Sequence, residues 1–191
     1  IFTLAPTVIQ IDVGELAAVQ ATLGIAHPTG YPLFTILGYL FNQIPLPFSS
    51  IYKLNLLSAI WCAAGVIIFI YTAKLFLTNI EKFQTVKKLK SKKEEKKKKK
   101  QKESVSEVRE EKYQISDTVI YISAIAGGLI LAFSETYWFQ STAVEVYSLN
   151  IMLMLAVIYF LFKAFINEDK SFKDSLKYWM FFSFFLALGF S

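Results

Sequence analysis

The sequence predicts an all-α fold, a polytopic membrane helix bundle, and two observations lead to this prediction. First, 54% of the 191 residues are hydrophobic, with 18 phenylalanines, which is too apolar for an ordinary soluble domain. Second, the apolar residues gather in runs of about 20, the length that crosses ~30 Å of hydrocarbon as a helix. A single cysteine, Cys62, excludes an intramolecular disulfide, and with only one histidine the composition argues against a Cys/His zinc site.

The predicted segments follow the apolar runs. The chain starts at Ile1 without a methionine or a basic n-region, so no signal peptide is visible, and it stops at Ser191 inside an apolar run. We therefore expect a fragment that is truncated at both ends. The end of a first span and a first outer loop with short interfacial helices are predicted over 1–53. Complete spans are predicted over 54–77, 115–133 and 149–165, and a truncated span over 178–191. The segments between them are a lysine-rich cytoplasmic loop over 78–114, expected to be disordered, an outer loop over 134–148 and a cytoplasmic turn over 166–177.

Lysines determine the predicted orientation. They gather in positions 87–112 and again in 163–177, and the positive-inside rule places both groups in the cytoplasm. The first group could also bind nucleic acid or anionic headgroups, but a charge block without apolar periodicity favours a solvated loop, so no nucleic-acid partner is predicted. Of the 20 Lys and Arg, only Lys53 then falls on the outer side. Four acids share that side with it: Asp12, Glu15, Glu135 and Glu145.

The stretch 12–32 is the most informative part of that outer side. Asp12 and Glu15 lie one helical turn apart near the start of a short predicted helix, where the helix dipole favours negative charge. The elbow HPTGYP follows at 27–32 and cannot continue the helix, because each proline disfavours helical geometry in the residue before it. Ionisable groups beside a bilayer are costly. We therefore interpret this stretch as functional.

Several strings resemble a known family. DVGEL, LGIAHPTGYPLFTILGYLF, KLNLLSA and FSETYWFQSTAVEVYSLN are similar to domain-of-unknown-function family 2723, multi-pass membrane proteins related to protein O-mannosyltransferases. The resemblance covers most of the chain apart from the lysine-rich loop. It implies the GT-C fold, with an active site on the outer face of a helical membrane bundle. It also implies transfer of a mannose-like sugar from a polyprenyl-phosphate donor to Ser or Thr hydroxyls of exported proteins, either at a bacterial inner membrane or in the endoplasmic reticulum.

The same resemblance implies the catalytic residues. Asp12 matches the essential acid of the first outer loop, and Glu15 matches the second acid of the DxGE pattern. A hydroxyl acceptor needs a base within hydrogen-bond reach of its proton, so Asp12 is the predicted general base; its alternative role is an N-cap for the short helix. Glu15 is expected to hold the acceptor or to influence the protonation of Asp12. Its alternative role is that of a first-turn partner of the helix dipole.

The predicted substrate-binding residues lie in the elbow and in two later segments. Glu145 matches the acid of the EVYxLN stretch and is expected to bind sugar hydroxyls or a protein cation. His27 is expected to contact the donor phosphate or to carry a proton, and Tyr31 to stack on the sugar or to lie in the membrane interface. Lys53 stands where the family has an arginine. It is expected to bind the phosphate of the polyprenyl-phosphate donor or to extend its ammonium group to the lipid headgroups. Two neighbours of Glu145 complete the predicted set, Tyr147 and Asn150.

Two alternatives stay open. A divalent cation held by Asp12, Glu15 and the donor phosphate fits magnesium chemistry, but two carboxylates do not establish a site, so no metal and no cofactor is assigned. The second functional hypothesis is a transporter or flippase segment whose outer acids bind a substrate or a coupling ion. Transporters place such acids and broken helices near the middle of the membrane. Here the acids flank the predicted spans, which favours the enzyme over the transporter.

Overall fold

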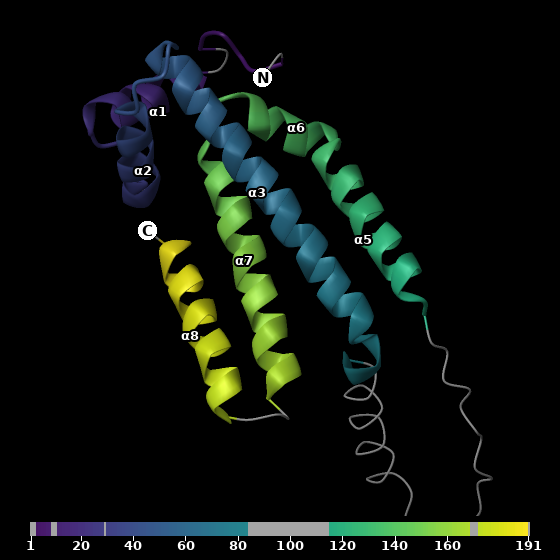
Figure 1. Ribbon diagram of the computed structural model, residues 1–191. Helices are drawn as coiled ribbons and strands as arrows, with labels where there is room; N and C mark the ends of the chain where they lie inside the picture. Colours follow the sequence, from purple (N-terminus) through teal and green to yellow (C-terminus); the bar gives the residue numbers. More distant parts are fainter. Residues whose placement is uncertain (1–2, 9–10, 29, 84–114, 169–171, 191) are drawn as a thin grey trace, which may run out of the picture.

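The structure is a computed structural model that describes residues 3–8, 11–28, 30–83, 115–168 and 172–190 (Figure 1). Over these ranges the chain forms helices and the turns between them, without a strand. The prediction of an all-α helical bundle is confirmed for this part. The predicted lysine-rich loop falls mostly on 84–114, outside the described residues.

Four helices form the body of the bundle. They are α3 (Ser50–Thr78), α5 (Asp117–Ala132), α7 (Val146–Asn167) and α8 (Phe172–Leu188). Figure 1 shows them as one layer, in which α7 packs between α3 and α8 while α3 packs between α7 and α5. The apolar runs explain these helices, since long apolar segments beside lipid must satisfy their backbone groups internally.

Three short helices gather at one end of this layer. They are α1 (Ile11–Thr22), α2 (Pro32–Asn42) and α6 (Glu135–Thr142). In Figure 1 they lie where α3 and α7 begin and where α5 ends. α1 and α2 pack against each other and against α3, and α6 packs on α3 from the other side. α6 forms inside the predicted outer loop over 134–148, and its acid Glu135 lies in the first turn, where the dipole stabilises it.

Among the described residues, two helices are long and apolar enough to cross a membrane, α3 with 29 residues and α7 with 22. A third such segment exists only if α5 and α6 count together across their 63° bend. α8 has 17 residues, at the short end of the spanning range, and it begins inside the segment predicted as a turn over 166–177. α2 has 11 residues and is too short to cross.

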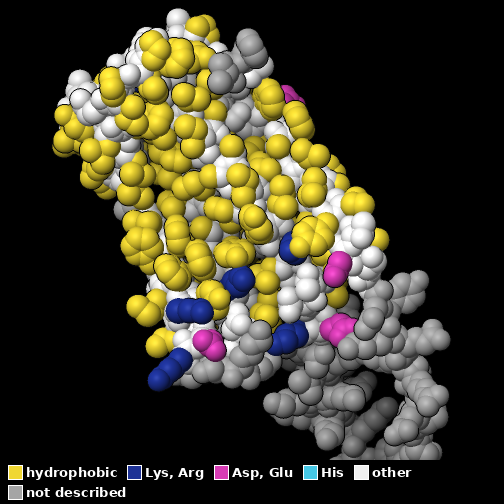
Figure 2. All heavy atoms as spheres, viewed as in Figure 1, with side chains coloured by type: hydrophobic (Ala, Val, Ile, Leu, Met, Phe, Trp, Pro, Cys, Tyr) yellow, Lys and Arg dark blue, Asp and Glu magenta, His cyan; other side chains and the backbone are white. Residues whose placement is uncertain are grey.

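Charge is distributed unevenly along the bundle. Figure 2 shows lysine and acidic side chains at the end where α7 meets α8, and a broad apolar surface over the rest of that face. At this end the Lys82 ammonium donates to the carbonyl of Ile166, at 3.0 Å. The described lysines therefore gather away from α1, α2 and α6, apart from Lys53. This separation is what the predicted orientation requires, and the side of the membrane that each end faces stays a prediction.

Gln20 and Gly38 hold α1 against α2. The Gln20 side chain is 1% exposed, and its Nε2 donates to the carbonyl of Phe34 at 2.9 Å. A Cβ atom on Gly38 would lie 2.1 Å from Cδ of Gln20, closer than any real contact. Only glycine therefore fits at position 38 while Gln20 keeps its hydrogen bond.

Gly38→Ala is expected to lower the free energy of unfolding by about 1–3 kcal/mol, the usual cost of overpacking. Gly127→Ala is the matched control, since the nearest atom to its new Cβ would be Cε1 of Phe69 at an ordinary 3.5 Å, and alanine favours a helix interior. Thermal unfolding of the purified full-length protein in detergent measures both. Equal melting temperatures for the two variants would contradict this account of the α1–α2 contact.

Candidate active site

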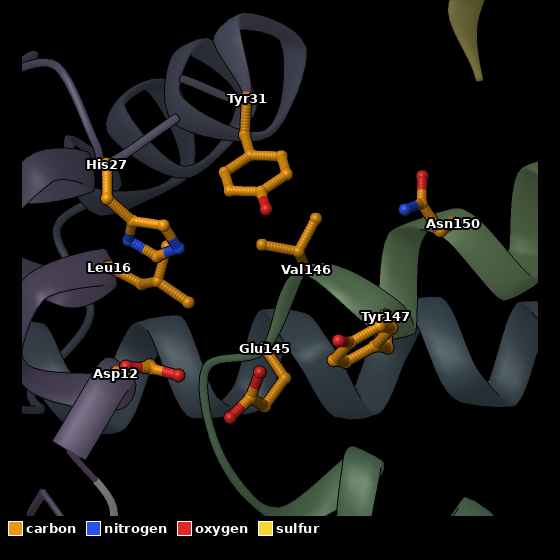
Figure 3. A pocket seen from close by; sticks show the side chains of 8 residues that line it. All are labelled: Asp12, Leu16, His27, Tyr31, Glu145, Val146, Tyr147 and Asn150. Carbon is orange, nitrogen blue, oxygen red and sulfur yellow. The ribbon is translucent and has the colours of Figure 1, made fainter. Parts of the chain in front are cut away.

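One polar pocket lies between α1, the elbow that follows it and the start of α7 (Figure 3). Its volume is about 100 Å³. Pockets that enclose a whole ligand usually measure roughly 300–1,000 Å³, so this one fits a single group such as a phosphate or the reacting end of a sugar. Six predicted site residues line it, from two segments far apart in the sequence. The full lining is Asp12, Leu16, His27, Tyr31, Glu145, Val146, Tyr147 and Asn150.

The buried face of α1 aims Asp12 at this pocket. Val13 and Leu16 are 0% and 2% exposed and pack into the apolar core with Phe34 and Leu54. Burial of these two side chains fixes the rotation of the helix about its axis. Asp12, one turn before Leu16, then lies exposed in the first turn of α1, and its carboxylate points into the pocket (Figure 3).

Glu15 does not line the pocket and binds His27 instead. Its Oε1 accepts from the backbone N–H of His27 at 2.7 Å, and its Oε2 lies 3.2 Å from Nδ1 of the ring. An ionised carboxylate only accepts hydrogen bonds, so Nδ1 is the donor in this contact. The backbone hydrogen bond, assisted by the ring contact and its charge, lowers the pKa of Glu15 below the ordinary value. Glu15 therefore links α1 to the elbow.

The elbow places the Tyr31 ring over the pocket. Gly30 has a φ of 91° and Tyr31 a φ of 44°. Both lie at positive φ, which residues other than glycine rarely adopt. The Gly30 N–H donates to the carbonyl of His27 at 2.8 Å, and the Tyr31 ring meets the His27 ring edge to face at 5.8 Å. Such backbone strain costs of order 1–3 kcal/mol and tends to occur at functional sites.

Glu145 faces Asp12 across the pocket (Figure 3). It is 8% exposed and occupies the N-cap position of α7, where its side chain makes no capping hydrogen bond. Its backbone carbonyl accepts from the Ser148 hydroxyl at 2.7 Å. Burial, and then the charge of Asp12, raises the pKa of Glu145. The carboxylate that interacts with Asp12 is therefore Glu145, from a different segment of the chain, whereas Glu15 was the expected partner.

Tyr147 and Asn150 complete the wall that α7 supplies. They lie three residues apart in the first turns of the helix, so both project from one face. Figure 3 shows the Tyr147 ring beside Glu145 and the Asn150 side chain farther along α7. Together with Tyr31 they give the pocket neutral hydrogen-bonding groups around its two carboxylates.

Lys53 lies outside the pocket. Its ammonium donates to the carbonyl of Asn42, and to that of Ile44 at 3.3 Å, and the residue is 9% exposed. Asn42 ends α2, and cations are stabilised at helix C-termini because the carbonyl groups there lack helical partners. The structure therefore places Lys53 as a cap for α2, away from the position that a phosphate ligand of this pocket would need.

Sequence reasoning missed Asn55, which holds the Glu145 segment in place. Asn55 is 0% exposed. Its Oδ1 accepts from the N–H of Val144 at 2.9 Å, and its Nδ2 donates to the carbonyl of Ala5 at 2.7 Å. One side chain on α3 thus joins the N-terminal segment to the residue before Glu145. The sequence feature that could have indicated this role is the polar side chain of Asn55 near the start of an apolar run.

Asn55→Ala is expected to destabilise the fold, because it leaves two buried backbone groups without partners at about 1–3 kcal/mol each. Asn79→Ala is the matched control at the C-cap of the same helix, since its Nδ2 donates to the nearby carbonyl of Leu75. Thermal unfolding of the full-length protein tests both variants. An Asn55→Ala protein as stable as Asn79→Ala would contradict the bridging role.

The described residues include no group of three or more His, Cys, Asp or Glu side chains placed to share a metal ion. The pocket itself contributes two carboxylates from the chain, Asp12 and Glu145. The hypothesis that Asp12 and Glu15 share a cation has no geometric support, because Glu15 is engaged with His27.

Comparison with known proteins identifies the family. A family profile described as "Protein O-mannosyl-transferase TMEM260 N-terminal domain" matches residues 12–191. The chain belongs to this family. In this chain the TMEM260 N-terminal domain begins at Asp12 and so includes all eight residues of the pocket. The resemblance to protein O-mannosyltransferases is thereby confirmed, while the domain-of-unknown-function label is not.

Two curated relatives bear the same name. A protein O-mannosyl-transferase tmem260 of Dictyostelium discoideum is 38% identical over 80 residues, which cover 40% of this chain and 10% of the relative. A protein O-mannosyl-transferase TMEM260 of Mus musculus is 44% identical over 62 residues, covering 32% of this chain and 9% of the relative. The matched stretch is thus about a tenth of each relative's length. No solved structure matches the chain.

Proposed function

We propose that the chain belongs to a membrane glycosyltransferase of the GT-C type. In this proposal the enzyme moves a mannose-like sugar from a polyprenyl-phosphate carrier to Ser or Thr hydroxyls of exported proteins, with Asp12 as general base. The names of the relatives support protein glycosylation. The observation that most strongly supports the proposal is the pocket, in which Asp12 faces Glu145 at the end of the bundle away from most of the described lysines.

A lipid-linked donor fits the surroundings of the pocket. An apolar groove of about 390 Å³ runs between α7 and α8 and begins at Asn150, which also lines the polar pocket. Met154 and Phe185 line the groove farther from the pocket. An amphiphile with a polar head and a long apolar tail would place its head in the pocket and its tail along this groove.

The pocket offers the groups that the reaction needs. The acceptor oxygen attacks the anomeric carbon, the bond from that carbon to the phosphate oxygen breaks, and the electron pair leaves with the phosphate. Asp12 takes the proton of the hydroxyl, which makes the oxygen a competent nucleophile. Glu145, whose raised pKa keeps its proton to higher pH, binds a sugar hydroxyl. A phosphate leaves without strong acid assistance, so one base suffices.

The active face is proposed to be extracytoplasmic, in the endoplasmic reticulum lumen or the periplasm. The separation of the lysines from the pocket supports this orientation under the positive-inside rule. The position of the pocket also favours an enzyme over a transporter. It lies at the ends of α1 and α7, whereas transporters bind substrate where spans are interrupted near mid-membrane.

A direct assay tests the proposal. Full-length protein in lipid nanodiscs is mixed with a Ser/Thr-rich acceptor peptide and a polyprenyl-phosphate sugar carrying a radiolabel. Label is expected in the peptide, and base treatment is expected to release it as from an O-linked sugar. A nucleotide sugar is the control donor and is expected to give none. Transfer from the nucleotide sugar alone would overturn the proposed donor.

A further inference from the structure

We propose that Glu15 and His27 form a dyad in which Glu15 holds the imidazole and His27 Nε2 binds the phosphate of the donor. This inference rests on the proposed function and deepens it. It assigns His27 as a catalytic residue that touches the leaving group. It assigns Glu15 as a positioning residue that acts through His27.

The geometry of the dyad leaves Nε2 for the pocket. Glu15 engages both the backbone N–H of His27, at 2.7 Å, and Nδ1 of its ring, at 3.2 Å. His27 nevertheless lines the pocket (Figure 3). Nδ1 is occupied by Glu15, so Nε2 is the ring nitrogen that remains for a ligand. A carboxylate that binds one imidazole nitrogen fixes the orientation of the other, as in metal sites and hydrolase triads.

The charge balance of the pocket calls for a cation beside the phosphate. Two lining residues are carboxyl groups, Asp12 and Glu145, which repel an incoming anion. Among the described lining residues, His27 is the one side chain that can carry a positive charge. Lys53, the other candidate from the sequence, donates to backbone carbonyls at the end of α2. The contacts with Glu15 hold the imidazole at the pocket, where Nε2 is placed to donate to an anion.

The elbow holds the ring firmly. The carbonyl of His27 accepts from the Gly30 N–H at 2.8 Å, and the Tyr31 ring packs edge to face on the imidazole. His27 contacts Glu15 from α1 and Tyr31 from the elbow, and the other titratable residues that line the pocket with it are Asp12 from α1 and Glu145 and Tyr147 from α7. Preorganised donors of this kind stabilise charge that develops in the transition state.

The step is balanced without a further reactant. As the bond between sugar and phosphate breaks, its electron pair passes to the phosphate oxygen. The N–H of His27 Nε2 donates a hydrogen bond to the phosphate and keeps its proton. The proton of the acceptor hydroxyl passes to Asp12. His27 thus stabilises the departing charge, while Asp12 performs the proton transfer.

Two histidine variants separate the ring nitrogens. In His27→Asn the amide nitrogen takes the place of Nδ1, which preserves the contact with Glu15 and removes Nε2. In His27→Gln the amide nitrogen reaches toward the place of Nε2, and the side-chain contact with Glu15 is lost while the backbone hydrogen bond to Glu15 remains. Asparagine is expected to weaken inhibition of the full-length enzyme by free polyprenyl phosphate by roughly tenfold or more, the effect of one hydrogen bond to a charged group. Glutamine is expected to retain part of that inhibition.

The role of Glu15 is tested by a double-mutant cycle. Glu15→Gln is expected to weaken inhibition by polyprenyl phosphate less than His27→Asn does. In the double variant the two effects are expected not to add, because Glu15 acts only through His27. The KM for the lipid-linked donor is likewise expected to rise less in Glu15→Gln than in His27→Asn. A purely structural role of Glu15 would lower stability and leave phosphate inhibition unchanged.

The outcomes distinguish this inference from the proposed function. Wild-type inhibition by polyprenyl phosphate that persists fully in a folded His27→Asn protein, or that is lost in Lys53→Met instead, overturns the dyad while the proposed donor stands. Additive effects of the two substitutions overturn the role of Glu15. A wild-type enzyme that polyprenyl phosphate does not inhibit contradicts the proposed donor itself.

Discussion

Asp12→Asn is expected to abolish sugar transfer in an otherwise folded protein. Removal of a positioned general base costs typically 10²–10⁴-fold in rate, and asparagine cannot accept the proton of the acceptor hydroxyl. The substitution is nearly isosteric and lies at an exposed position in the first turn of α1. Its effect on stability is therefore expected to be small. The labelled-peptide assay and thermal unfolding of the full-length protein measure the two effects separately.

Asp117→Asn is the matched control for this substitution. Asp117 also lies exposed in the first turn of a helix, α5, but at the opposite end of the bundle (Figure 1). If Asp12 served only the helix dipole, the two variants would behave alike. Full activity of Asp12→Asn, or an equal loss in Asp117→Asn, would contradict the role of Asp12 as base.

Glu145→Leu is expected to stabilise the protein at neutral pH while it slows transfer. Burial and the charge of Asp12 raise the pKa of Glu145 above its ordinary value of 4.5, so the folded protein binds this proton more tightly than the unfolded chain does. The stability that protonated Glu145 provides is complete below pH 4.5 and is lost as the pH rises through the raised pKa. Leucine removes this penalty at neutral pH.

In the proposed function the same substitution removes the hydrogen bonds through which Glu145 would bind a sugar hydroxyl, so kcat/KM is expected to fall by about 10- to 100-fold. Thermal unfolding as a function of pH and the transfer assay measure the two effects. The gain in stability over wild type should shrink at acidic pH. Glu135, an exposed acid in the first turn of α6 at the same end of the bundle, provides the control: Glu135→Leu should not raise stability, because it removes a favourable interaction with the helix dipole, and it should leave transfer unchanged. A Glu145→Leu protein that is less stable than wild type at neutral pH would contradict this electrostatic account.

The sequence predicts the helices and most of the pocket for a clear physical reason. Apolar runs long enough to cross hydrocarbon leave few alternatives to a helix, and the rare ionisable groups beside them stand out. Asp12, His27 and Glu145 are found in this way, and Tyr31 is found as an aromatic residue of the elbow. The structure brings all four to one pocket.

The partners of these groups are not predictable from local spacing. Asp12 and Glu15 are three residues apart, which suggests a pair. The chain instead reverses after α1, where Leu23 has a φ of 55°, and this turn returns His27 to Glu15 while Asp12 faces Glu145. Lys53 and Asn55 are likewise engaged by carbonyl and amide groups of distant segments. α6 is missed because its eight residues have no long apolar run.

Photoaffinity labelling tests the central claim most directly, namely that α1, the elbow and the start of α7 together bind the reacting end of a lipid-linked sugar. The probe is a polyprenyl-phosphate sugar with a photoreactive group on the sugar, used with the full-length protein in nanodiscs. We predict adducts within residues 12–31 and 145–150, both suppressed by excess unlabelled donor. Competable adducts confined to other parts of the protein would contradict the claim.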